Sequence, residues 1–140
     1  MDAAMTTKSP VRFDGLYSAV SMAHRVDGVT AYLRFYPDGV VLRTTSTAPA
    51  DDVAKWLVKG FRAGPWNADG AYSITDKRIE FTFHLKQDKS APLYNDKVPD
   101  GEINYRGRIE DDRLILTCRD GILKSRSDWI FSFNAVRGMK

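Results

Sequence analysis

The sequence predicts an all-β protein, an antiparallel up-and-down barrel of about eight strands with one helix inserted after the third strand. Segments 78–86, 102–110 and 128–136 alternate apolar and polar side chains, which is the period of a strand with one buried face. Turn pairs such as Asp76-Lys77 and Asp111-Asp112 favour pairing between sequential strands. Closing such a meander removes exposed sheet edges, whereas an open sandwich, the rival architecture, keeps them.

The stretch 31–46 (AYLRFYPDGVVLRTTS) is the strongest local signal, and it is typical of a β-hairpin. Its Pro37-Asp38-Gly39 segment suits a type I turn completed by a left-handed glycine, which makes a three-residue loop with a bulge. A two-residue loop would instead place Arg43 opposite Arg34, an unfavourable pair of like charges. The bulged loop pairs Tyr36 with Val40, Phe35 with Val41, and Leu33 with Arg43. One face of the hairpin then carries Leu33, Phe35, Val41, Arg43 and Thr45, and we expect Leu33, Phe35 and Val41 to point inward.

One helix is predicted over 47–59, where Pro49 suits the first turn and Gly60 suits the end. Val53, Trp56 and Leu57 share one face of it at i, i+3, i+4 spacing. We expect this face to pack on an open end of the β structure. There it would be either a lid over an internal void or a permanent plug.

The remaining pattern divides the chain into an N-terminal tail, 1–10, expected to be disordered, and a single β-barrel domain, 11–140. A first strand is expected from Phe13 to about Met22. The segment 87–101 holds two prolines and little apolar surface, and we expect a mobile loop there. The later strands are expected over 71–75, 78–86, 102–110, 113–119 and 128–136.

Composition excludes several classes of protein. With 140 residues, of which 43% are hydrophobic, the chain suits one globular domain and not a disordered protein. Its 21 basic and 18 acidic residues are interspersed, which argues against a surface built for nucleic acid. No apolar stretch is long enough to cross a membrane, and 1–10 lacks the apolar core of a signal peptide. The single cysteine, Cys118, suits a reducing compartment, so we expect a cytoplasmic protein.

Two motifs resemble known families. Phe13-x-Gly15-x-Tyr17 is similar to the Gly-x-Trp start of lipocalins and fatty-acid-binding proteins, with Tyr17 in place of the Trp. The hairpin motif from Tyr32 to Val41, followed by Thr44-Thr45, a helix and Gly70-x-Tyr72, resembles the C-terminal β domain of certain F-box-only proteins and a group of uncharacterised bacterial lipocalin-like domains. The resemblance implies a lipocalin-like (calycin) barrel for 11–140 and carries no catalytic residues. The F-box segment itself is absent from the chain, so an adaptor role in ubiquitin ligation is not implied.

Arg43 is the most suggestive single residue, because an inward arginine near a barrel mouth suits a ligand carboxylate, whereas a rim arginine would lie in solvent. Five aromatic side chains are expected to line the interior, as a ligand pocket or as ordinary core, and Trp56 of the helix is expected to cover it. The candidate ligand-binding residues are therefore Arg43, Trp56, Phe81, Phe83, Tyr105, Trp129 and Phe131.

Other chemistry finds little support. His24 and His84 have no partner at metal-ligand spacing, so no metal or other cofactor is expected. Cys118 shares an apolar face and reads as a buried structural thiol. The basic residues of the last third interleave with acidic ones, which favours a mixed surface over a nucleic-acid site.

These observations lead to one functional hypothesis and two alternatives. The first is a barrel that binds a hydrophobic or amphipathic small molecule, with no nucleic-acid or membrane partner. The second is a protein-interaction module with a filled core. The third is a barrel-type isomerase or cyclase whose catalytic groups the sequence does not reveal.

Overall fold

The computed structural model describes residues 10–22, 29–63, 66–67, 69–85, 90, 96–97, 101–121 and 124–139. The predicted tail 1–10 and loop 87–101 lie almost wholly outside these residues. The barrel strands are β1 (Gly15–Met22), β2 (Thr30–Phe35), β3 (Val40–Ser46), β6 (Asp69–Thr75), β7 (Arg78–Leu85), β8 (Gly101–Glu110), β9 (Arg113–Asp120) and β10 (Ser125–Ala135).

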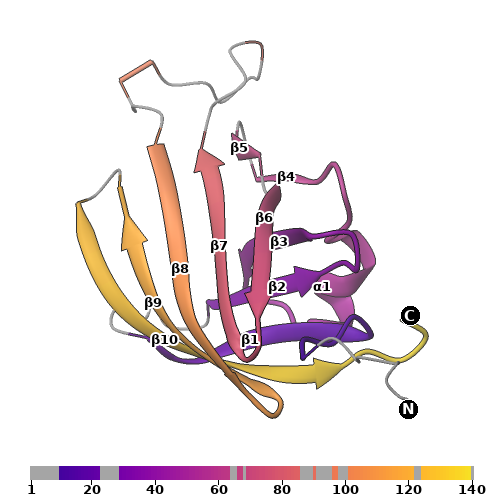
Figure 1. Ribbon diagram of the computed structural model, residues 1–140. Helices are drawn as coiled ribbons and strands as arrows, with labels where there is room; N and C mark the ends of the chain where they lie inside the picture. Colours follow the sequence, from indigo (N-terminus) through magenta and orange to yellow (C-terminus); the bar gives the residue numbers. More distant parts are fainter. Residues whose placement is uncertain are drawn as a thin grey trace.

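These eight strands form a closed antiparallel barrel in the order β1-β10-β9-β8-β7-β6-β3-β2, which confirms the predicted fold class (Figure 1). The chain runs mostly from neighbour to neighbour, and β1 closes the barrel by pairing with both β10 and β2. A register shift between Ala19 and Ser21 bends β1 where it follows β10. The short strands β4 (Arg62–Ala63) and β5 (Trp66–Asn67) form a separate two-stranded sheet.

The predicted hairpin register is confirmed. Phe35 pairs with Val41 and Leu33 pairs with Arg43 between β2 and β3. The turn closes through a 2.9 Å hydrogen bond from the Tyr36 amide to the Val40 carbonyl. Gly39 takes φ +94°, the left-handed conformation that the bulged loop requires. Leu33, Phe35 and Val41 face the barrel interior, as expected.

The helix α1 (Ala50–Trp56) follows β3, but it is shorter than predicted. Pro49 is extended at the position before the helix, and the backbone leaves the helical region at Leu57. The Ser46 hydroxyl accepts the Ala48 amide N–H at 3.0 Å, so it holds the approach to the helix rather than its first turn.

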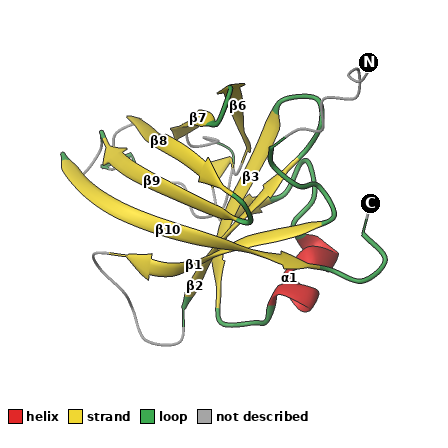
Figure 2. Ribbon diagram, turned by 60° about the horizontal axis from the view of Figure 1, so that its bottom comes forward, coloured by secondary structure: helices red, strands yellow, loops and turns green. Residues whose placement is uncertain are grey.

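The helix packs on the outer wall of the barrel, which corrects the expectation of a lid or plug at an open end (Figure 2). The hairpin is apolar on both faces, and its outward Tyr32 and Leu42 need cover from water. They form a second buried cluster with Leu16 of β1 and with Val53 and Leu57. The Tyr32 hydroxyl also donates to the Ala48 carbonyl at 2.7 Å.

One end of the barrel is closed by the segment that precedes β1. Val11 is 2% exposed in the main core, and the Arg12 amide donates to the Tyr17 hydroxyl at 3.0 Å. The Arg12 guanidinium lies 4.1 Å from the centre of the Phe133 ring and pairs with Asp14 at 3.0 Å. We call this closed end the floor of the barrel. We call the opposite end of the barrel the mouth.

Candidate functional site

A hydrogen bond crosses the barrel interior on the mouth side of the core. The Nε of Arg43, on β3, donates to the Tyr105 hydroxyl, on β8, at 2.9 Å. β3 and β8 are not neighbours, because β6 and β7 stand between them in the barrel order. Arg43 is partly buried and Tyr105 is 1% exposed. The structure therefore places Arg43 on the inward face, where the hairpin register predicts it.

Tyr105 stays protonated across the physiological range. Burial raises the pKa of Tyr105 to about 12, and the nearby Arg43 cation only partly opposes that effect. Its hydroxyl therefore accepts a hydrogen bond from Arg43 and keeps a proton of its own to donate. A tyrosine in this state is a poor general base.

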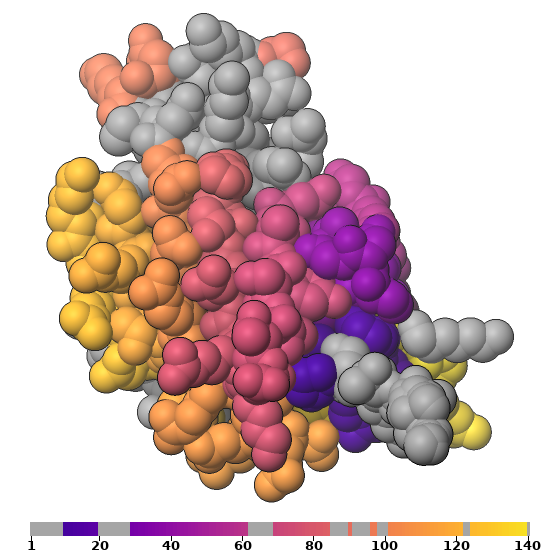
Figure 3. All heavy atoms as spheres, in the orientation of Figure 1, coloured from indigo at the N-terminus to yellow at the C-terminus, as the bar shows by residue number. Residues whose placement is uncertain are grey.

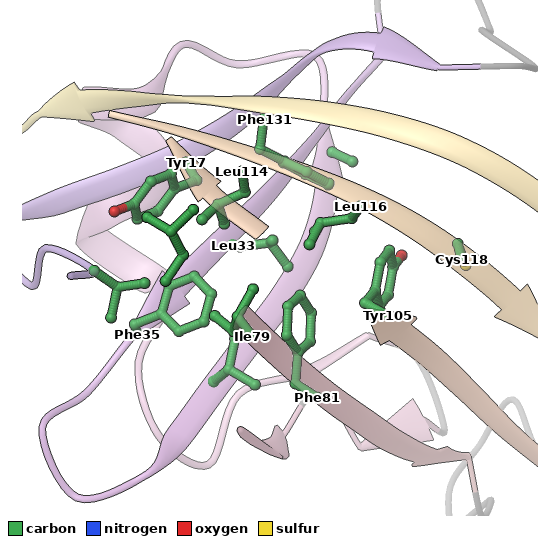
Figure 4. Close-up of a cluster of buried hydrophobic side chains, with 14 of the residues drawn as sticks. Tyr17, Leu33, Phe35, Ile79, Phe81, Tyr105, Leu114, Leu116, Cys118 and Phe131 are labelled. Carbon is green, nitrogen blue, oxygen red and sulfur yellow. The ribbon is translucent and has the colours of Figure 1, made fainter. Parts of the chain in front are cut away.

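Cys118 lies opposite Tyr105 on the neighbouring strand β9 and is 5% exposed. Burial raises the pKa of its thiol, while a hydrogen bond from the Tyr105 hydroxyl acts in the other direction. Figure 4 shows the Tyr105 hydroxyl on the side of its ring that faces Cys118. A neutral, buried thiol is a poor nucleophile, so Cys118 contributes a polarisable contact surface to the site.

The five aromatic residues predicted for the interior do converge. Phe81 stacks on Tyr105 with ring centres 4.9 Å apart, and Phe83 meets the same ring edge-on at 6.1 Å. Trp129 stacks on Phe131 at 5.6 Å, and both rings lie within 6.4 Å of Tyr105. All five belong to, or pack against, one core cluster, and Figure 4 shows Phe81, Tyr105 and Phe131 of it.

Inward residues with different degrees of exposure lie at both ends of the barrel. Near the floor, Ile109 and Leu114 are at most 3% exposed, whereas Ile74 and Phe133 are partly buried. Toward the mouth, Ile103 and Trp129 are only partly buried. The Trp129 indole N–H donates to the Ser127 hydroxyl at 2.8 Å. The mouth half of the interior thus combines aromatic side chains with the Arg43–Tyr105 pair.

Trp56 does not join this group. Its side chain is 36% exposed, and its ring lies 4.9 Å from that of Phe61, outside the barrel wall. Val53 and Leu57 turn toward the barrel and Trp56 turns away, because the helix needs only one narrow stripe to cover Leu42 and its neighbours. Trp56 is therefore not part of the candidate site.

Sequence reasoning missed Ser127 and did not assign Cys118 to the site. Cys118 sits opposite both Tyr105 on β8 and Ser127 on β10. Counting registers outward from the Asp111-Asp112 turn would have placed Cys118 beside Tyr105. Ser127 could not be placed that way, because it lies beyond the longer loop that joins β9 to β10.

The described residues contain no metal centre. No group of three or more His, Cys, Asp or Glu side chains there is placed to hold a metal ion. His84 lies on the outer face and pairs with Glu102 at 3.0 Å, with both side chains largely exposed. His24 lies outside the described residues.

The protein is a closed eight-stranded antiparallel β-barrel with an arginine–tyrosine pair in its interior. Comparisons with protein-family models, with curated proteins and with solved structures found no match to this chain. Within the described residues, no helix is long and apolar enough to span a membrane.

Proposed function

We propose that this protein is a lipocalin-like barrel that binds a small amphipathic molecule in the mouth half of its interior. The acidic group of the ligand would lie against Arg43 and Tyr105, and its apolar part would lie among Phe83, Ile103 and Trp129. A single observation carries the proposal, the hydrogen bond between Arg43 and Tyr105 inside the barrel.

The chemistry of Arg43 favours an anionic partner. Arginine has five N–H donors, and its bond to Tyr105 uses Nε alone. Among the described residues, no carboxylate forms an ion pair with Arg43. A partly buried cation with only a phenol as its partner is costly unless an anion completes it. A ligand carboxylate would accept a bidentate, charge-assisted pair of hydrogen bonds from the two Nη groups.

The filled floor limits the size of the ligand. Because Ile109, Leu114 and Phe35 are almost completely buried, a long extended chain has no place at the bottom of the barrel. A short apolar tail suits the mouth half better. The free, buried thiol of Cys118 fits a reducing compartment, so we include a cytoplasmic location in the proposal.

Calorimetric titration with octanoate and with octanol tests this proposal. We expect octanoate to bind saturably to the natural protein and Arg43→Gln to weaken it by about 10- to 100-fold, because a charge-assisted hydrogen bond is lost. Octanol binding should change by less than threefold in the same variant. Arg108→Gln removes the same charge from the exposed outer face and should leave octanoate binding unchanged.

Failure to bind either compound would indicate a core filled through to the mouth, as in an interaction module. Equal effects of Arg43→Gln and Arg108→Gln on octanoate affinity would show that Arg43 does not bind the ligand. Native mass spectrometry of protein purified from its own host would then identify the natural ligand, which would appear as added mass.

A further inference from the structure

Two arginines face each other on the outer wall of the barrel, away from the candidate ligand site. Arg119 of β9 and Arg126 of β10 are direct cross-strand partners, and both side chains are exposed. Like charges placed directly opposite each other on a sheet destabilise it. This pair therefore calls for a physical reason beyond the stability of the barrel. Figure 3 shows part of this outer surface, with β8 in orange and β10 in yellow at the left.

The two arginines line a hollow of about 450 Å³ on the outer face. Asn104 of β8 pairs directly with Arg119, so a row of three N–H donors crosses β8, β9 and β10. The Thr82 hydroxyl donates to Oδ1 of Asn104 at 2.6 Å, which leaves the amide N–H groups of Asn104 available. The remaining lining residues are Arg106 and Thr117.

Two carboxylates that flank this row have other partners. Glu80 pairs with Arg106 at 3.5 Å, and Asp128 accepts a hydrogen bond from the Thr117 hydroxyl at 3.2 Å. In the part of the chain that the structure describes, no carboxylate forms an ion pair with Arg119 or Arg126. Among the described residues, the row thus presents two guanidinium groups and an amide NH₂ group, with no carboxylate paired to either arginine.

We propose that this hollow binds a phosphate group carried by a small molecule. Two guanidinium forks and an amide suit a tetrahedral anion that presents several acceptor oxygens and up to two negative charges. A single carboxylate would meet only part of this donor set. An extended nucleic acid suits the hollow less well, because Glu80 and Asp128 flank it and none of its described lining residues is aromatic and able to stack on a base.

The test is a calorimetric titration with inorganic phosphate and with glycerol 3-phosphate, in a buffer free of other oxyanions. Binding of either probe should be saturable, and the probe that binds more tightly identifies the free or the esterified source. The Arg119→Gln/Arg126→Gln double variant should bind at least tenfold more weakly. The matched control is Arg108→Gln/Arg113→Gln, which removes two charges from exposed positions on β8 and β9 outside the hollow and should change affinity less than twofold.

A second variant keeps the proposal testable if the double variant does not fold. Arg126→Glu turns the like-charge pair into an opposite-charge pair, so the ligand-free protein should melt at a higher temperature while phosphate binding is lost. Absence of saturable binding to the natural protein, or an equal loss in the control variant, would overturn the proposal. A 12-nucleotide oligothymidylate that binds more than tenfold more tightly than both phosphates would also overturn it, in favour of a nucleic-acid partner. Octanoate binding is independent of this face and should be unchanged throughout.

Discussion

The Nε of Arg43 and the hydroxyl of Tyr105 meet at 2.9 Å across the barrel interior, although their strands are not hydrogen-bonded to each other. This contact links two strands of the barrel wall that are separated by β6 and β7. Its energetic contribution can be measured directly, because each partner can be changed without touching the backbone pairing.

Tyr105→Phe should lower the free energy of unfolding by about 1–3 kcal/mol, because it leaves the Nε of Arg43 without its acceptor. Arg43→Met combined with Tyr105→Phe should cost less than the sum of the two single changes, since the second change removes a group already left unpaired. Urea denaturation of the four proteins measures this coupling. Tyr32→Phe, which removes a hydroxyl bonded outside the barrel, should be additive with Arg43→Met. A coupling of zero between residues 43 and 105 would contradict the assigned contact.

Stability should fall as the pH rises through the range between the tyrosine pKa of the unfolded chain, about 10, and that of folded Tyr105, about 12. In this window the unfolded chain releases its proton and the folded protein retains it, so alkali favours unfolding. Below pH 10 Tyr105 is protonated in both the folded and the unfolded state, so its contribution to the free energy of unfolding is constant. The loss attributable to Tyr105 should be on the order of 1–3 kcal/mol.

Urea denaturation at intervals of half a pH unit between pH 9 and 11.5 measures this slope. Tyr105→Phe should reduce it without abolishing it, because burial also raises the pKa of Tyr17, Tyr32 and Tyr72. An unchanged slope in Tyr105→Phe would show that its hydroxyl is not buried in solution.

From the position of the helix we predict opposite effects on stability for substitutions of the adjacent residues Leu57 and Trp56. Leu57→Ala should cost about 2–5 kcal/mol, because Leu57 is completely buried between the helix segment and the outer wall. Trp56→Ala should cost less than about 1 kcal/mol, since its ring is partly exposed and contacts mainly Phe61. Thermal and urea unfolding measure both. Octanoate binding should survive Trp56→Ala, and its loss there would restore the helix as a lid.

Much of the fold was predictable because strand side chains alternate and short turns restrict pairing. The register of the β2–β3 hairpin followed from the Pro37-Asp38-Gly39 turn and from the cost of opposing Arg34 with Arg43. The convergence of Phe81, Tyr105 and Phe131 followed from the same alternation once the sheet was assumed to close. These are local properties, set by backbone geometry and by the polarity of neighbouring residues.

The sequence by itself thus predicted most of the strands and the register of the β2–β3 hairpin, and it left open whether Arg43 points inward or lies in solvent at the rim. Only the tertiary structure decided that Arg43 meets Tyr105, because that contact depends on how far the walls of the closed barrel stand apart. It also decided that the helix covers the outside of the hairpin, since Tyr32 and Leu42 left apolar surface there that local periodicity could not assign to a partner. Barrel closure and the burial of an outer sheet face depend on contacts between segments far apart in the sequence. The residues of a single strand therefore do not specify them.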